Sequence, residues 1–330
     1  MTINLDLKAF EYINPASIDE AVAVLGKDKA KVMAGGTDLL GGMKDGLQDH
    51  HFEVLVNIKS IPNMAYIKEN GNTIAIGAAT RVQDVADDPV VKEKLPVLAQ
   101  AAGIVASPQI RNLGTLGGNL AQRPRCWYYR HELFHCYKKG GDFCFAVTGS
   151  NKYHAILGGE LCYIVHPSDT APALMALNAT AKIVGPNGEK MVPFDDFFIG
   201  PRVDVLRENV MGPQDILVEV QVPVLKPNTK SIYLKYKERG VWDFALTSVA
   251  AVATINSGTW EDGRIVLGGV APVPWPAREA DNFLAGKTLD ESTAREAADR
   301  ALFGARPMTD NSFKIDLAKG LIERALLSLL

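Results

Sequence analysis

Residues 32–39 read Val-Met-Ala-Gly-Gly-Thr-Asp-Leu, and residues 114–120 read Gly-Thr-Leu-Gly-Gly-Asn-Leu. In both segments, paired glycines allow the backbone to approach a ligand closely and to turn several N–H groups toward one point. Such an arrangement binds phosphate oxygens, and the hydroxyl of Thr37 or Thr115 adds a further donor. For either segment taken alone, a tight turn without a ligand is the alternative interpretation.

Neither loop matches the better-known phosphate-binding motifs. The second loop spaces its glycines as Gly114-x-x-Gly117-Gly118, which differs from the G-x-G-x-x-G of a Rossmann fold. The first loop is followed by Gly41-Gly42 without the Lys-Ser/Thr pair of a P-loop. A dinucleotide on these loops would therefore need another scaffold.

Asp169 is a candidate ligand for the sugar part of a nucleotide. It follows a predicted strand over 162–166, and a carboxylate at that place can accept hydrogen bonds from ribose or ribityl hydroxyls. The alternative is an N-cap for a predicted helix over 170–179, because aspartate is a favoured N-cap residue.

All four cysteines of the chain fall within 37 residues: Cys126, Cys136, Cys144 and Cys162. Four thiolates can ligate a tetrahedral zinc ion or a [4Fe–4S] cluster. The spacing contains no C-x-x-C pair and differs from the bacterial ferredoxin run, so it leaves iron–sulfur, zinc and unligated buried cysteines open. The histidines that can replace a thiolate are His131, His135, His154 and His166.

Aromatic and basic residues are interleaved with the cysteines, among them Trp127, Tyr128 and Arg125. Such a shell can exclude water and offset the charge of an anionic cluster. Aromatic and basic residues also occur together in sites for single-stranded nucleic acid. The net charge of the chain is −3, which argues against a nucleic-acid partner.

Composition limits the class of protein. The chain has 330 residues, of which 47% are hydrophobic and 22% charged, as expected of a soluble globular protein of about two domains. No apolar run approaches the ~20 residues that span a bilayer, and the first residues lack the pattern of a signal peptide. Four cysteines are too few for a disulfide scaffold, so we expect a cytoplasmic protein without a membrane span.

The order of predicted elements indicates two domains. Ser17 and Glu20 form a capping box before a short helix, Thr80 is expected to cap another helix, and Asn-Gly pairs at 70–71 and 187–188 predict hairpins. Strands are expected over 217–222, 232–237, 248–255 and 265–270, followed by helices over 290–303 and 315–329. Strands followed by helices are typical of an α+β domain. We place the domains at 1–225 and 226–330.

Taken in order, these motifs resemble those of the FAD-binding medium subunits of the molybdenum hydroxylases, the group of xanthine dehydrogenase, carbon monoxide dehydrogenase and aldehyde oxidoreductase. The resemblance covers nearly the whole chain. It rests on residues 34–39 (AGGTDL), 110–120 (IRNLGTLGGNL), 167–169 (PSD), 233–235 (YLK), 243–245 (DFA) and 248–251 (SVAA).

The resemblance implies a two-part FAD-binding domain of the vanillyl-alcohol-oxidase type, followed by a smaller α+β C-terminal domain. It implies that the glycine loops hold the FAD pyrophosphate and adjoining groups, that Asp169 holds sugar or ribityl hydroxyls, and that Lys235 lies near the cofactor. The candidate FAD-binding residues are Val32, Met33, Ala34, Gly35, Gly36, Thr37, Asp38, Leu39, Thr115, Leu116, Gly117, Gly118, Asn119, Asp169 and Lys235. Without the resemblance, Lys235 is interpreted as an exposed strand lysine.

Most subunits of this kind lack the cysteine-bearing insert, about 123–162. The insert is similar to that of two subgroups with an extra [4Fe–4S] cluster, 4-hydroxybenzoyl-CoA reductase and a bacterial periplasmic-type aldehyde oxidoreductase. Residues 119–123 (Asn-Leu-Ala-Gln-Arg) and the placement of Cys162 before Asp169 match their layout, whereas the loop lengths differ from the CoA reductase. The resemblance thus implies a [4Fe–4S] cluster on the four cysteines.

The resemblance also implies a role in electron transfer within a larger enzyme. A large subunit would carry the molybdenum cofactor, a small subunit would carry [2Fe–2S] clusters, and the FAD would exchange electrons with NAD, ferredoxin, a quinone or oxygen. A heterotrimer, paired into a dimer, is the implied assembly, and no catalytic acid, base or nucleophile is expected on this chain. A stand-alone flavin oxidase and a zinc-stapled binding module are the alternatives.

Overall fold

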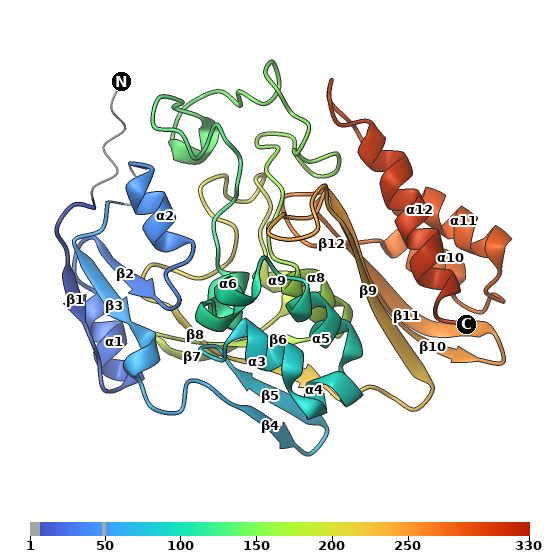
Figure 1. The fold of residues 1–330 in the computed structure, drawn as a ribbon, viewed down its shortest axis with the longest axis horizontal. Coiled ribbons are helices and arrows are strands. Elements are labelled where there is room, and N and C mark those ends of the chain that lie inside the picture. The colour runs from blue at the N-terminus through green and yellow to red at the C-terminus, as the bar shows by residue number, and fades with distance from the viewer. Residues whose placement is uncertain (1–6, 48–50) are drawn as a thin grey trace.

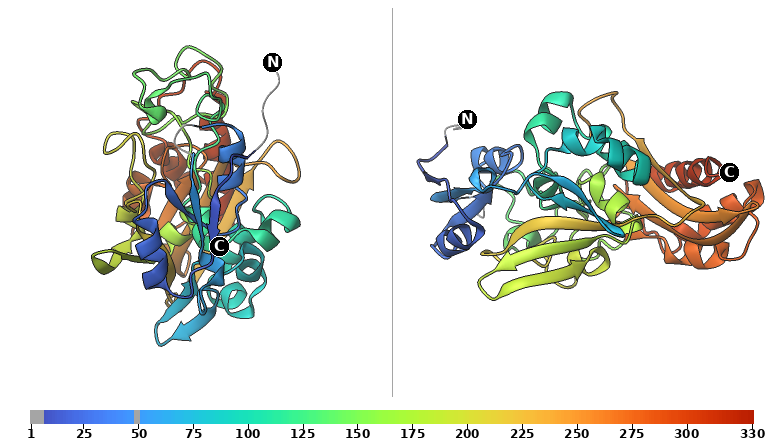
Figure 2. Two further views of the ribbon diagram at one scale, coloured as in Figure 1. Left: turned by 90° about the vertical axis from the view of Figure 1, so that its left-hand side faces the viewer. Right: turned by 90° about the horizontal axis from the view of Figure 1, so that it is seen from below.

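The computed structural model describes residues 7–47 and 51–330. From the N-terminus, the chain forms a small parallel sheet, a five-stranded sheet with helices, and a four-stranded sheet backed by helices (Figure 1). Seen from below, the N-terminal unit and the last helices lie at opposite ends of the molecule (Figure 2).

The N-terminal unit is a parallel sheet in the order β1-β3-β2. Its elements are β1 (Glu11–Ile13), α1 (Ile18–Leu25), β2 (Ala30–Met33), α2 (Leu39–Lys44), β3 (Val54–Asn57) and the short 3₁₀ helix η2 (Ile58–Ser60). Half of the predicted capping box is present: the Ser17 hydroxyl accepts a hydrogen bond from Glu20 N, whereas the Glu20 carboxylate accepts from Ala16 N instead of Ser17 N. Gly26 follows the helix. β2 delivers the chain directly into the first glycine loop.

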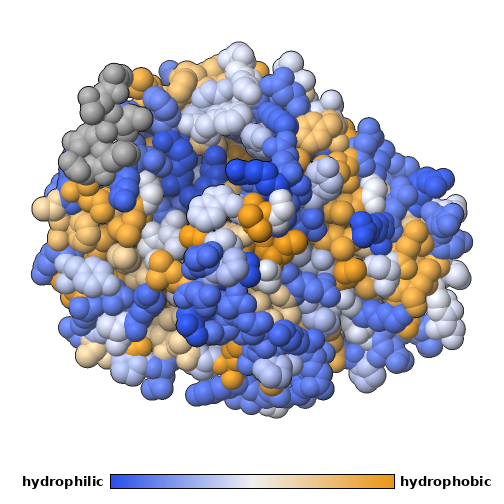
Figure 3. All heavy atoms as spheres, in the orientation of Figure 1, coloured by the Kyte–Doolittle hydropathy of each residue, from blue (hydrophilic) through white to orange (hydrophobic). Residues whose placement is uncertain are grey.

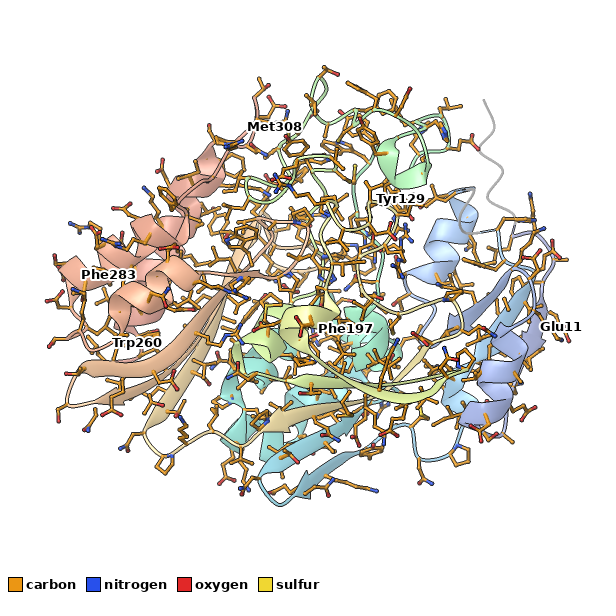
Figure 4. The ribbon with its side chains drawn as sticks, turned by 180° about the vertical axis from the view of Figure 1, so that it is seen from behind. Glu11, Tyr129, Phe197, Trp260, Phe283 and Met308 are labelled. Carbon is orange, nitrogen blue, oxygen red and sulfur yellow. The ribbon has the colours of Figure 1, made fainter. Side chains whose placement is uncertain are left out.

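The second sheet is antiparallel in the order β4-β5-β8-β6-β7. Its strands are β4 (Ile67–Asn70), β5 (Thr73–Gly77), β6 (Thr180–Gly185), β7 (Gly188–Pro193) and β8 (Ile216–Pro223). Both predicted hairpins are confirmed, with Gly71 and Gly188 at positive φ where a side chain would be strained. One face of this sheet packs in the main core through Ile76 and Val220. Phe197, labelled in Figure 4, belongs to the same core.

Short helices cover that core. They are α3 (Val82–Asp87), α4 (Pro89–Lys94), α5 (Pro96–Gly103), α6 (Pro108–Leu113), α7 (Leu116–Leu120), α8 (Thr170–Ala176) and α9 (Phe194–Phe197). The expectation that Thr80 caps a helix is wrong. Arg81 holds the N-cap position of α3, and the Thr80 hydroxyl instead exchanges hydrogen bonds with the Tyr66 backbone.

The C-terminal sheet is antiparallel in the order β12-β11-β10-β9, and its strand β10 is buried on both faces. Its elements are β9 (Thr229–Tyr236), β10 (Thr247–Asn256), β11 (Thr259–Gly268), β12 (Trp275–Pro276), α10 (Arg278–Leu284), α11 (Glu291–Ala301) and α12 (Phe313–Leu327). Alternation along β10 turns Ala250 and Val252 toward α5 and α8, and Val249 and Ala251 toward the last helices. The sequence did not predict α10.

The cysteine-bearing insert is irregular, and its one regular element is the 3₁₀ helix η3 (Tyr137–Lys139). The strand predicted over 162–166 is wrong. Instead of joining a ladder, the Tyr163 carbonyl accepts from Ala155 N, and His166 N donates to the Ala271 carbonyl. Tyr129 of the insert and Met308, before α12, both lie at the upper side of Figure 4. None of the described helices is long and apolar enough to cross a membrane.

Lys314 of α12 holds the insert against the C-terminal domain. Its side chain is fully buried and donates to the carbonyls of Tyr153, His154 and Gly269 at 2.8–3.1 Å. Burial lowers the pKa of Lys314 to about 7. No carboxylate among the described residues pairs with Lys314. The three carbonyl acceptors therefore offset the cost of burying its amino group.

Lys314→Met is expected to lower the free energy of unfolding by about 2–4 kcal/mol, because buried carbonyls lose their donor. The matched control is Lys319→Met on the same helix, which removes only the exposed pair with Asp299 and should cost under about 1 kcal/mol. Denaturant unfolding of both variants measures the difference. Equal losses would contradict the role given to Lys314.

Candidate functional site: a cofactor cavity and a cysteine cluster

The two glycine loops pack directly against each other. A Cβ atom added at Gly35 would lie 2.5 Å from the carbonyl oxygen of Leu113 and 2.8 Å from Cα of Gly114. Gly36 has a φ of +71°, a conformation that side chains disfavour. Only glycine permits this approach, so the two backbones meet with no side chain between them.

The second loop is hydrogen-bonded to the turn that follows β5. Gly117 N donates to the Ala78 carbonyl at 2.9 Å, and Leu116 N donates to the Thr80 carbonyl at 2.8 Å. The Thr115 hydroxyl caps α7 by accepting from Gly118 N at 3.1 Å. These bonds hold Gly118 at the surface of a cavity, while Leu116 is turned into the core.

Both loops open onto one cavity of about 650 Å³. That volume lies within the range of small-molecule and cofactor sites. Thirteen of the fifteen candidate FAD-binding residues line it, and Met33 and Leu116 do not. The space-filling view shows this face hollowed beneath the insert, with hydrophilic residues around the hollow (Figure 3).

Asp169, Tyr233 and Lys235 form a buried group at the wall of this cavity. The Asp169 carboxylate accepts from the Tyr233 hydroxyl at 2.8 Å and from Lys235 Nζ at 2.7 Å. Lys235 lies on the same face of β9 as Tyr233, and its side chain is 1% exposed, so it is not an exposed strand lysine. Burial and the neighbouring Asp169 carboxylate raise the pKa of Tyr233.

Asp169 occupies the N-cap position of α8, but its side chain makes no capping hydrogen bond. The Ser168 hydroxyl accepts from Ala171 N instead. Asn119 of the second glycine loop accepts from the hydroxyls of Ser168 and Thr170, so the turn before α8 is tied to that loop. The Asp169 carboxylate is thereby left to its contacts across the cavity wall.

Asp38 joins the first glycine loop to the start of the insert. Its carboxylate accepts from Arg123 N at 2.7 Å and forms ion pairs with Arg125 and Arg130. Burial alone raises the pKa of Asp38, but the charges of Arg125 and Arg130 hold it below its usual value. The folded state therefore favours the ionised form of the Asp38 side chain over the protonated form.

The four cysteines line one small cavity within the insert, together with His154 and aromatic residues. All four are free thiols. His154 Nε2 lies 3.2 Å from the Cys126 sulfur, whereas His131 and His135 are exposed and His166 lies in the wall of another cavity. Of the four histidines named from the sequence, only His154 accompanies the cysteines.

Burial raises the pKa of Cys126 and that of Cys162 to about 12. The positive charge of Lys138 is the largest effect that opposes burial at Cys162. Within the described ranges, no three His, Cys, Asp or Glu side chains are arranged to hold a single metal ion. The four thiols line a cavity of about 10 Å³.

Comparisons with known proteins place the chain. A family model described as the FAD binding domain in molybdopterin dehydrogenase matches residues 8–225. The chain belongs to this family. A second model, described as the CO dehydrogenase flavoprotein C-terminal domain, matches residues 232–329.

Curated relatives cover nearly the full length. The carbon monoxide dehydrogenase medium chain of Hydrogenophaga pseudoflava is 33% identical over 324 residues, 96% of each chain. The aldehyde oxidoreductase FAD-binding subunit PaoB of Escherichia coli K12 is 33% identical over 318 residues, 95% of this chain and 96% of PaoB. The expected family, the medium subunits that bind FAD, is thus confirmed.

Solved structures agree with the fold. Carbon monoxide dehydrogenase from Hydrogenophaga pseudoflava matches with a TM-score of 0.78 at 31% identity over 98% of each chain. Quinoline 2-oxidoreductase from Pseudomonas putida 86 matches with a TM-score of 0.76 at 27% identity over 98% of each chain. The expected order of an FAD-binding domain followed by a C-terminal domain is confirmed.

Several residues of the cavity wall were not predicted. Arg125, Glu208 and the segment Trp242–Phe244 line it, and Trp242 has a φ of +76°. Arg125 follows the second glycine motif closely, and Asp243-Phe244 belongs to a quoted motif, so both carried a signal. Glu208 lies in a loop with no recognisable motif, and only tertiary structure brings it to the site.

Gly35→Ala is expected to weaken flavin retention at least about tenfold, because the added Cβ forces the two loops apart. Gly41→Ala is the control, since a Cβ at that α2 position meets nothing within 4 Å. Flavin absorbance per purified chain reports the outcome. Full flavin content in the Gly35 variant would show that loop contact is not needed for the site.

Asp38→Asn is expected to lower the free energy of unfolding by about 1–3 kcal/mol, because Arg125 and Arg130 lose a partly buried charge partner. Since the pKa of Asp38 is lowered, its contribution is present above pH ~4 and is lost as pH falls further. Asp45→Asn is the control, because Asp45 is more exposed and lies 3.9 Å from Arg130. Unfolding curves at pH 7 and pH 3.5 test this; the gap between wild type and Asp38→Asn should narrow at the lower pH.

Proposed function

We propose that this chain is the FAD- and [4Fe–4S]-carrying electron-transfer subunit of a molybdenum-cofactor hydroxylase, dehydrogenase or reductase complex. Membership of the FAD-binding family gives the flavin part of this assignment. The observation that carries the rest is a pair of cavities linked by the ion pair between Lys138 and Glu208. One is walled by the glycine loops, and the other is lined by all four cysteines.

The proposed FAD contacts follow from the larger cavity. Both glycine loops would hold the pyrophosphate and adjoining groups. The backbone of Gly35 and Gly36 would bind the phosphate oxygens, and Gly117 and Gly118, whose N–H groups are bonded within the protein, would leave room for the adjoining groups because they carry no side chain. The Asp169 carboxylate would accept hydrogen bonds from hydroxyls of the sugar or ribityl chain. Tyr233 and Lys235 hold that carboxylate in its orientation. Met33 and Leu116 would support the loops from behind rather than touch the cofactor.

The cysteine set suits an iron–sulfur cluster. Buried thiols in an aromatic shell stay protonated unless a cationic group offsets their charge, and bound iron supplies that charge. All four thiols line one small cavity, so the chain offers one ligand for each of the four iron corners of a cluster. Cys126, Cys136, Cys144 and Cys162 are the proposed ligands.

FAD would supply the ability to take up electrons singly and to release them as a pair. The residues of this chain would position the cofactor, exclude water with the aromatic shell, and hold the insert against both domains.

The proposed partners are a large subunit with the molybdenum cofactor and a small subunit with [2Fe–2S] clusters. The proposed external acceptor or donor is NAD, ferredoxin, a quinone or oxygen. The relatives' names as medium chains and FAD-binding subunits support a shared assembly over a stand-alone oxidase or a zinc module.

Iron and flavin measured per copy of this chain, in the anaerobically purified complex, test the proposal. We expect one flavin and about four iron atoms beyond those of the partner's [2Fe–2S] clusters. Cys136→Ser should remove the excess iron, whereas His131→Ala, at an exposed position of the same insert, should retain it. Zinc in place of excess iron would reject the cluster, and a flavin-free complex with loaded partners would reject the whole assignment.

A further inference from the structure

A buried ion network crosses from the cysteine cavity to the larger cavity. Lys138 follows Cys136 by two residues and lines the cysteine cavity, and its side chain is 2% exposed. It is paired with Glu208, whose side chain is 4% exposed. Glu208 belongs to the wall of the larger cavity and also lies 3.2 Å from Arg123 Nε.

Lys138 stands out among its neighbours. Of the described residues that line the cysteine cavity, it is the one with a full charge, while the others are cysteine, histidine, aromatic or aliphatic. The insert arginines Arg125 and Arg130 pair with Asp38 instead. A buried charge acts through a lower effective dielectric than an exposed one, so the field of Lys138 at the thiols is weakly screened.

We propose that Lys138, held in place by Glu208, is the fixed positive charge that sets the reduction potential of the group on the four cysteines. This inference rests on the proposed [4Fe–4S] cluster. A cluster ligated by four thiolates is anionic and gains one negative charge with each electron it takes up. An ammonium group nearby stabilises the reduced form more than the oxidised form and raises the potential, and the Glu208 carboxylate opposes that effect.

Redox titration of the complete complex, followed by electron paramagnetic resonance of the cluster, gives the test. Lys138→Met should shift the cluster potential below that of the wild type. Lys138→Arg keeps the charge and should leave the potential near the wild-type value. Glu208→Gln should shift the potential upward. Lys152→Met is the matched control, because Lys152 lies in the same insert but its pair with Glu238 is exposed. The cluster potential of this variant should equal that of the wild type.

The opposite signs separate an electrostatic role from a structural one, since lost packing would not move the two variants in opposite directions. An unchanged potential in Lys138→Met with full iron content overturns the inference. If that variant loses its cluster, Glu208→Gln decides, and an unchanged or lowered potential there overturns it. A wild-type complex without excess iron is a distinct result, because it rejects the proposed cluster before any variant is compared.

Discussion

The contact between Gly35 and the backbone of residues 113–114 is the constraint on which the site depends. The two loops come from different parts of the fold, one after β2 and the other between α6 and α7. The first is carried by a small parallel sheet, and the second is hydrogen-bonded to the end of β5. Because no side chain separates them, the backbones of both loops line one cavity. The docking of the N-terminal unit therefore creates the cofactor space.

The opposite wall of that space depends on a contact between the domains. Asp169 precedes α8, whereas Tyr233 and Lys235 come from β9 of the C-terminal sheet. A buried ion pair gains little net stability, because desolvation offsets most of the attraction. Its contribution here is orientation: the carboxylate is held by two donors at the cavity wall. β9 places those donors through its ladder with β10, the most buried strand of the C-terminal sheet.

Local patterns predicted much of this arrangement, and tertiary contacts decided the rest. The capping of α1 by Ser17 and the two Asn-Gly hairpins followed from short-range chemistry. Thr80 and the stretch 162–166 failed because their polar groups are satisfied by residues distant in sequence, the Tyr66 backbone and the loops at 155 and 271. The glycine loops could be recognised from their motifs. Glu208 could not, since nothing near it in sequence indicates either cavity.

Buried charged groups help to fix the cysteine-bearing insert to the rest of the molecule. A segment of about forty residues with one short 3₁₀ helix is far longer than ordinary loops, which points to a functional role. Its apolar contacts are divided: Tyr129 and Cys136 pack with Leu47, whereas Ile156 and Leu157 join the core of the C-terminal domain. Buried polar groups fix it as well: Asp38 at its start, Glu208 at η3, and Lys314 near its end. With the proposed function, a metal group on the four cysteines would cross-link the segment further, and the pair of Lys138 with Glu208 would connect its cavity to the flavin cavity.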